Sequence, residues 1–79
     1  MIKLKNIEKN DGLMQCSIIP EDSKDAGHLI VDVTSGMIKE YTLPKGYEWC
    51  KKHINHAKDT LLKLYNAKET PKEKIVMWI

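Results

Sequence analysis

The sequence predicts an α+β domain in which an antiparallel sheet of about five strands is covered on one face by a single long amphipathic helix. Three observations lead to this prediction. Apolar and polar side chains alternate in short segments before residue 44, apolar side chains recur at helical spacing over residues 47–69, and a short apolar segment follows the helix. The expected order is four strands, then the helix, then a fifth strand, all within one domain, residues 1–79.

The first two strands are expected to form a hairpin. Residues 2–8 and residues 13–19 alternate apolar and polar side chains, as strands do when one face lies on a core. Between them, Gly12 can adopt the left-handed backbone conformation that closes a short hairpin loop. Pro20 ends the second strand, because proline has no backbone N–H to donate to a sheet.

The remaining strands follow the same pattern with one exception. Residues 28–34 and residues 37–43 flank a turn that ends in Gly36, which predicts a second hairpin. Residues 74–79 are expected to form the fifth strand, and both of its faces are apolar. Because one helix covers only one face of a sheet, Trp78 on the other face would need a partner, unless it lies at the sheet margin beneath lysine side chains.

Residues 47–69 carry the helical pattern. At 1.5 Å per residue such a helix is about 34 Å long, which would let it cross the whole sheet diagonally. Thr70 and Pro71 are expected to end it, because proline cannot continue a helix. Seven side chains share a stripe about 100° wide and are expected to face the core: Tyr47, Cys50, Ile54, Ala57, Leu61, Leu64 and Tyr65.

Cysteine usage and the N-terminal residues indicate a cytoplasmic protein. Only two cysteines are present, Cys16 and Cys50, whereas secreted domains of this size are usually rich in disulfides. The N-terminus lacks the apolar segment of a secretory signal, and no apolar run reaches the ~20 residues of a membrane-spanning helix. We therefore expect free thiols and no membrane association.

Lysine alone supplies the basic charge, and it is unevenly distributed. The chain has 13 basic residues, all lysine, and a net charge of +2. Residues 1–40 contain five lysines and seven acids, a net of −2, and residues 41–79 contain eight lysines and four acids, a net of +4. Lysine can bind phosphate as a point charge, whereas arginine supplies the planar fork that reads guanine. The composition therefore allows an acidic partner, nucleic acid included, but does not favour base-specific recognition.

The spacing of Cys50, His53 and His56 raises two kinds of chemistry. Cysteine and histidine bind zinc, and positions three apart are neighbours on a helix, with Cys16 as a candidate fourth ligand from the sheet. Cys50 near the helix start and His53 one turn later could instead form an activated thiol. Both hypotheses compete with a simpler interpretation, in which Cys50 belongs to the core and the histidines lie on a solvated flank. We favour that interpretation and predict no metal, cofactor or catalytic site.

One flank of the helix is a candidate protein-contact surface. Trp49, His53, His56 and Thr60 follow one another at helical spacing beside the core stripe, and tryptophan is enriched in binding hot spots. Together with Trp78, this flank favours a non-catalytic interaction or regulatory module that forms homodimers. The competing interpretation is that these residues are the margin of the contact between helix and sheet.

A lysine-rich helix face supports the main alternative, an accessory nucleic-acid-binding protein. Carboxylates interrupt this face, and no aromatic–basic pattern of an RNA-recognition motif is present. A metal or small-ligand binder is the third hypothesis. The candidate phosphate contacts on the helix, to which the lysines of the C-terminal tail would add, are Lys51, Lys52, Lys58 and Lys63.

Overall fold

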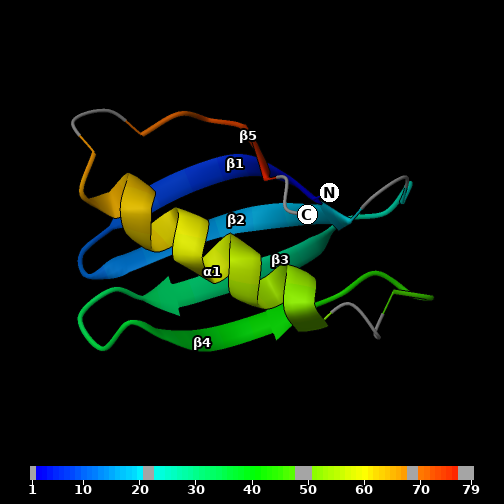
Figure 1. Ribbon diagram of the computed structural model, residues 1–79, viewed down its shortest axis with the longest axis horizontal. Helices are drawn as coiled ribbons and strands as arrows, with labels where there is room; N and C mark the ends of the chain where they lie inside the picture. The colour runs from blue at the N-terminus through cyan, green and yellow to red at the C-terminus, as the bar shows by residue number, and fades with distance from the viewer. Residues whose placement is uncertain (1, 21–22, 48–50, 68–69, 77–79) are drawn as a thin grey trace.

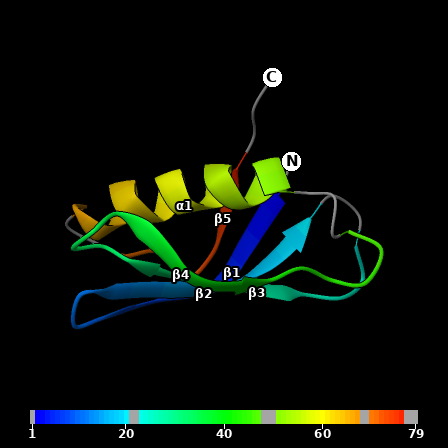
Figure 2. The same ribbon diagram turned by 90° about the horizontal axis from the view of Figure 1, so that it is seen from below.

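The computed structural model describes residues 2–20, 23–47, 51–67 and 70–76, and it confirms the predicted fold class. Five antiparallel strands form one sheet in the order β4-β3-β2-β1-β5, and one helix packs on a single face of it (Figures 1 and 2). The elements, in chain order, are β1 (Ile2–Asn10), β2 (Leu13–Pro20), β3 (Gly27–Asp32), β4 (Met37–Thr42), α1 (Lys51–Tyr65) and β5 (Lys74–Val76). The two edges of the sheet are therefore β4 and β5.

Strand β2 has the alternation that its sequence predicts. Met14, Cys16 and Ile18 are buried beneath the helix, and the residues between them face the open side of the sheet. Gly12 closes the β1–β2 turn with a φ of 72°, in the left-handed region that glycine adopts readily. The first predicted hairpin is thus confirmed.

Strand β1 departs from simple alternation at a bulge. Its pairing with β2 shifts between Lys5 and Glu8, and Asn6 has a φ of 52°. Regular alternation from Ile2 would point Asn6 into the core, but the extra residue places Ile7 there instead, 1% exposed. Asparagine tolerates the left-handed conformation better than most residues, so the bulge costs little at this position.

The second hairpin is shorter than the sequence suggests. Strand β3 ends at Asp32, where the Asp32 carboxylate accepts a hydrogen bond of 2.9 Å from the backbone N–H of Thr34. Such a side-chain contact replaces a sheet hydrogen bond and starts the turn early. Strand β4 also contains an irregularity, since Val31 pairs with Ile38 and Ile30 pairs with Glu40.

The helix is shorter than residues 47–69 at the ends that the structure describes. Tyr47 lies outside it, and the backbone N–H groups of Asn66 and Ala67 bond to carbonyls three residues earlier, at 3.2 and 3.1 Å. This tightening ends the last turn before the predicted stop at Thr70 and Pro71. Fifteen residues give a length of about 22 Å, and the helix still crosses the sheet diagonally from β4 toward β1 (Figure 1).

The core lies between the helix and the strands. On the helix, Ile54, Ala57 and Leu61 are buried, while Leu64 and Tyr65 are only partly covered. The sheet supplies the rest of the core: Ile2, Leu4, Ile7, Met14, Cys16, Ile18, Leu29 and Val31.

Within the described residues, no helix is both long and apolar enough to span a membrane.

Candidate functional site

The predicted helix flank is only partly available to a partner. Trp49 lies outside the described residues. His53 is 7% exposed, which corrects its expected place on the surface, because the helix is rotated so that His53 joins the contact with the sheet. His56 and Thr60 are half-buried, and the Thr60 hydroxyl donates a 3.0 Å hydrogen bond to the carbonyl oxygen of His56. Of the described residues of this flank, His53 is therefore buried, whereas His56 and Thr60 remain partly accessible.

The candidate zinc ligands are not brought together in the described part of the chain. Cys50 lies outside it, and no group of three or more His, Cys, Asp or Glu among the described residues could hold a metal ion. Cys16 is buried in the core, and the loss of hydration raises the pKa of its thiol from 9.0 to about 12. Because metals bind the thiolate, this environment disfavours Cys16 as a ligand.

A groove of about 310 Å³ separates the C-terminal half of α1 from β5. Leu64 lines it from α1, and β5 contributes Lys74, Ile75 and Val76. Because Ile75 pairs with Lys3, its side chain points to the open face of the sheet, where it is 54% exposed. Trp78, two residues beyond β5, lies outside the described residues. The groove is the place where the predicted helix flank and the fifth strand meet, and its described lining is Thr60, Lys63, Leu64, Lys74, Ile75 and Val76.

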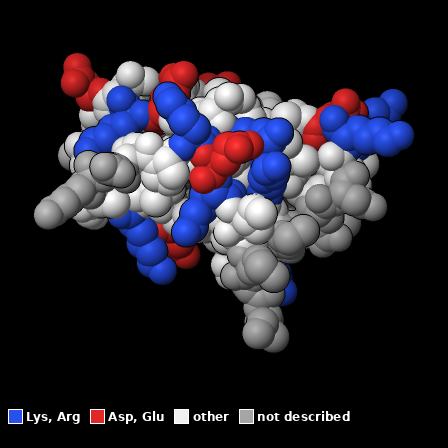
Figure 3. All heavy atoms as spheres, turned by 90° about the horizontal axis from the view of Figure 1, so that it is seen from above, with Lys and Arg blue, Asp and Glu red and all other residues white. Residues whose placement is uncertain are grey.

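Lysines from both ends of the chain gather at the β1–β5 edge. The ammonium groups of Lys3 and Lys5 lie 3.9 and 3.8 Å from the same carboxylate oxygen, Oε1 of Glu73. Lys74 pairs with Leu4 across the strands, and the carbonyl of Lys72 accepts a 3.1 Å hydrogen bond from Ile7. Seen from the β5 side, lysine side chains surround a small acidic patch (Figure 3). We call Lys3, Lys5, Lys72 and Lys74 the basic edge.

The four helix lysines predicted to contact nucleic acid do not form such a cluster. Lys51 and Lys52 are exposed at the start of α1, at the β4 end of its path across the sheet. The ammonium of Lys58 lies 4.0 Å from the carboxylate of Asp59. Lys63 lies farther along, in the α1–β5 groove with Lys74. Sequence reasoning missed the contribution of β1, because its lysines belong to the half of the chain with negative net charge.

The open face of the sheet has two halves. One half carries hydrogen-bond donors, and the other, the acidic half, carries carboxylates. Gln15 on β2 donates a 2.8 Å hydrogen bond from Nε2 to the Glu8 carboxylate on β1, and this pair lies on the acidic half. A shallow pocket of about 200 Å³ lies between the halves and is lined partly by Asn6 and His28. One row of cross-strand neighbours carries donors: Lys5, Ser17, His28 and Thr42. The next row carries two carboxylates: Glu8, Gln15, Ile30 and Glu40.

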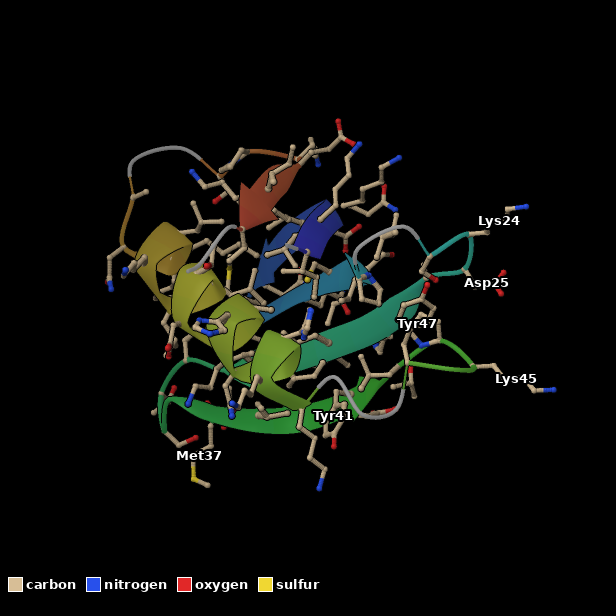
Figure 4. The ribbon with its side chains drawn as sticks, turned by 45° about the vertical axis from the view of Figure 1, so that its right-hand side comes forward. Lys24, Asp25, Met37, Tyr41, Lys45 and Tyr47 are labelled. Carbon is tan, nitrogen blue, oxygen red and sulfur yellow. The ribbon has the colours of Figure 1, made fainter. Side chains whose placement is uncertain are left out.

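The two edges of the sheet differ in how they are protected. The pairing irregularity in β4 leaves Lys39 as an extra residue, and charged Lys39 and Glu40 occupy the middle of the strand. Bulges and charges of this kind oppose edge-to-edge pairing. Met37 and Tyr41 are exposed apolar side chains of β4, at 66% and 38%, and both are labelled in Figure 4. Met37 lies on the open face and Tyr41 on the helix side.

A further cavity lies at the C-terminal end of α1. It measures about 570 Å³, opens widely to solvent and is lined mainly by polar residues of the β1–β2 turn. Lys9 reaches across it, donating a 3.1 Å hydrogen bond to the carbonyl oxygen of Tyr65 and lying 4.4 Å above the Tyr65 ring. A cation at this end of a helix satisfies a carbonyl and complements the dipole, so this arrangement serves the fold.

No protein-family model, curated protein sequence or solved structure matches this chain. The groove, the basic edge and the open face must therefore be interpreted from their own chemistry.

Proposed function

We propose that this chain is a cytoplasmic, non-catalytic protein-interaction module that self-associates through the outer edge of β5. The single observation that carries the proposal is Ile75, an apolar side chain that is 54% exposed on an edge strand beside the α1–β5 groove. Edge strands offer unpaired backbone N–H and C=O groups to a second strand. Unlike β4, strand β5 has no bulge in its pairing.

A second copy fits this edge through a symmetric antiparallel pairing centred on Ile75. Each Ile75 then lies opposite Ile75 of the second copy, and each Lys74 lies opposite Val76 of the second copy. Directly opposed residues in antiparallel strands point to the same face, with Cβ atoms about 5 Å apart. The two isoleucines would meet on the open face, and the Lys74–Val76 pairs would lie beside the two grooves.

The expected association is weak and concentration-dependent. Complete burial of an isoleucine side chain stabilises by about 1.5–3 kcal/mol, so covering the exposed half of Ile75 contributes about 1 kcal/mol per copy. Stable interfaces bury more than about 1,000 Å², which three residues of strand cannot supply alone. The contact must therefore include the groove wall, at Thr60 and Leu64.

Charge opposes the same contact. Pairing of two β5 edges brings two basic edges toward each other, and each of them carries four lysines around one carboxylate, Glu73. Exposed like charges repel less when salt screens them over about 8–10 Å. Self-association is therefore expected to strengthen as the salt concentration rises, which is opposite to the behaviour of a salt-bridged dimer.

The test is the solution mass of wild type and two matched variants, measured by sedimentation velocity over a range of concentrations. Wild type should shift from 9.1 kDa toward twice that mass as its concentration rises. Ile75→Lys should remain monomeric, because a charge replaces the central contact. Met37→Lys removes an equally large exposed apolar side chain at the opposite edge and should behave as wild type.

Two results would refute the proposal. One is wild-type protein that stays monomeric at the highest soluble concentration in both low and high salt. The other is equal loss of association in Ile75→Lys and Met37→Lys, which would place the contact elsewhere or make it non-specific. Circular dichroism of both variants establishes that they are folded.

A further inference from the structure

The donor row of the open face runs straight across four strands. Lys5, Ser17, His28 and Thr42 are successive cross-strand partners, so all four side chains point to the side of the sheet opposite the helix. Neighbouring strands are about 4.8 Å apart, which makes the row about 14 Å long. Ser17 and His28 are half-buried and Thr42 is exposed, so each is open to a ligand that lies flat on the sheet.

The basic edge lies at one end of this row. Lys5 belongs to both features, and Lys3 lies two residues away on the same face of β1. The side chains of Lys3 and Lys5 are 43% and 40% exposed, and Glu73 is the only carboxylate in ion-pair contact with them among the described residues. Ion pairs this exposed and this long hold little energy, so both lysines can turn to a stronger anion.

Among the described residues of β1 to β4, the carboxylates of this face lie on one side of the row. Glu8 and Glu40 occupy the next row, and Asp32 lies in the row after that. An anionic ligand is therefore repelled from that half of the face and confined to the donor row and the basic edge. Ile19 and Ile30, half-buried, flank the row and offer apolar side chains against which flat groups can lie.

We propose that the phosphate backbone of a single-stranded nucleic acid lies across the open face, from the basic edge along Lys5, Ser17, His28 and Thr42. Lysine ammonium groups, hydroxyls and imidazole N–H groups are the usual partners of phosphate oxygens. The described residues of this face include no arginine, tryptophan, tyrosine or phenylalanine to read or stack bases. Binding is therefore independent of base sequence and strongly dependent on salt.

Two other classes of partner, a membrane and a protein, fit the open face less well. Membrane binding by an amphipathic helix uses its exposed apolar face, and the apolar face of α1 is packed on the sheet. A protein partner derives its affinity from anchors that fill apolar pockets, and the pocket on this face is shallow and mostly polar. The proposal is separate from self-association at β5, which depends on Ile75 and the groove.

The experiment measures fluorescence anisotropy of a labelled oligothymidine about 16 nucleotides long over a series of salt concentrations. Each lost phosphate contact to a single strand should reduce the slope of log K against log salt by about 0.7. Lys5→Gln should show this reduction together with weaker binding at low salt. Lys45→Gln makes the same change of charge in a loop away from the sheet (Figure 4) and should keep the wild-type slope.

A second pair of variants tests the path across the sheet. Thr42→Glu and Met37→Glu each add one carboxylate at an exposed position on the open-face side of β4, but only Thr42 lies in the donor row. Thr42→Glu should weaken binding severalfold more than Met37→Glu. Equal effects of the two variants would refute the path, because they would show a response to net charge alone.

Competition separates the classes of polyanion. Poly-glutamate or anionic vesicles that displace the oligonucleotide as well as an equal charge of unlabelled oligothymidine would overturn the assignment to nucleic acid. So would the absence of binding at low salt. Failure here leaves self-association intact. Lys5→Gln removes one of the repelling lysines and should associate at least as strongly as wild type, whereas Ile75→Lys should lose self-association and still bind the oligonucleotide.

Discussion

The burial of Cys16 makes a quantitative prediction about thiol reactivity. Cys16 is 3% exposed at the centre of the contact between β2 and α1, and desolvation raises the pKa of its thiol from 9.0 to about 12. The nucleophile is the thiolate, so this change makes the reactive form about 1,000-fold rarer at neutral pH than in the unfolded chain. Steric exclusion of the reagent adds to that factor.

The assay compares reaction with a chromogenic disulfide reagent in native and denatured protein, using a Cys50→Ala background so that Cys16 is the only thiol. Native Cys16 should react at least about 1,000 times more slowly than in denaturant, through transient opening of the fold. The converse background, Cys16→Ala, reports on Cys50 alone. A native rate for Cys16 within tenfold of the denatured rate would show that the helix does not cover β2 as described.

The same thiol links stability to alkaline pH. Its pKa is higher in the folded than in the unfolded protein, so the stabilising contribution is complete below pH 9.0 and is lost as the pH rises from 9.0 toward about 12. At about pH 10.5 the expected loss is about 2 kcal/mol in the free energy of unfolding. In Cys16→Ala this part of the loss should disappear, and an unchanged alkaline profile would contradict the argument.

Two further predictions concern the packing that holds the sheet and helix together, and both are measured by urea unfolding. Leu61→Ala removes a side chain that is 0% exposed and should lower the free energy of unfolding by about 2–5 kcal/mol. Leu62→Ala, at the half-buried margin of the helix, should lower it by less than half as much. Equal losses would argue against the helix rotation described. Gly27→Ala places a Cβ against the backbone carbonyl oxygen of Thr42 and should cost about 1–3 kcal/mol. At Gly36 nothing lies near an added Cβ, but φ is 72°, so Gly36→Ala should lower the free energy of unfolding by about 1 kcal/mol. A smaller loss for Gly27→Ala than for Gly36→Ala would contradict the close approach of β3 and β4.

Local patterning was sufficient to predict the elements of this fold. Strand β2 is the clearest case, because alternation places Met14, Cys16 and Ile18 on one side without any tertiary information. The helix stripe was predicted almost as well, with Ile54, Ala57 and Leu61 buried as expected. These predictions succeed because period and burial agree in both elements.

The departures arise where tertiary or side-chain contacts compete with local pattern. In β1, alternation would have buried Asn6, and a bulge instead buries Ile7. Burial of an apolar side chain stabilises the fold more than the regular strand pairing that the bulge interrupts. Asp32 ends β3 early through a hydrogen bond that no periodicity reveals. The burial of His53 depends on a small rotation of the helix about its axis, which a helical wheel does not fix.

The candidate sites depended on strand order, which the sequence did not predict. Nothing in the lysines at positions 3 and 5 indicates that they will lie beside Lys72 and Lys74, because this requires β5 to pair with β1. Once that pairing is known, alternation places Lys3 and Lys5 on the open face of this edge and Lys74, opposite Leu4, on the helix side. The same pairing exposes Ile75 at the margin of the sheet, so one topological fact produces both proposed surfaces.

Their common origin couples the two proposals energetically. Repulsion between two basic edges opposes pairing at β5, and a phosphate backbone bound at Lys3 and Lys5 would neutralise that charge more completely than salt does. A ligand that relieves repulsion in the dimer binds the dimer more tightly than the monomer, and linkage then requires that it promote association. Oligothymidine should therefore increase the sedimenting mass of wild type. In Lys5→Gln the increase in sedimenting mass should be smaller. An oligonucleotide that instead dissociates the dimer would contradict the coupling, because it would show that phosphate and the second copy compete for one surface.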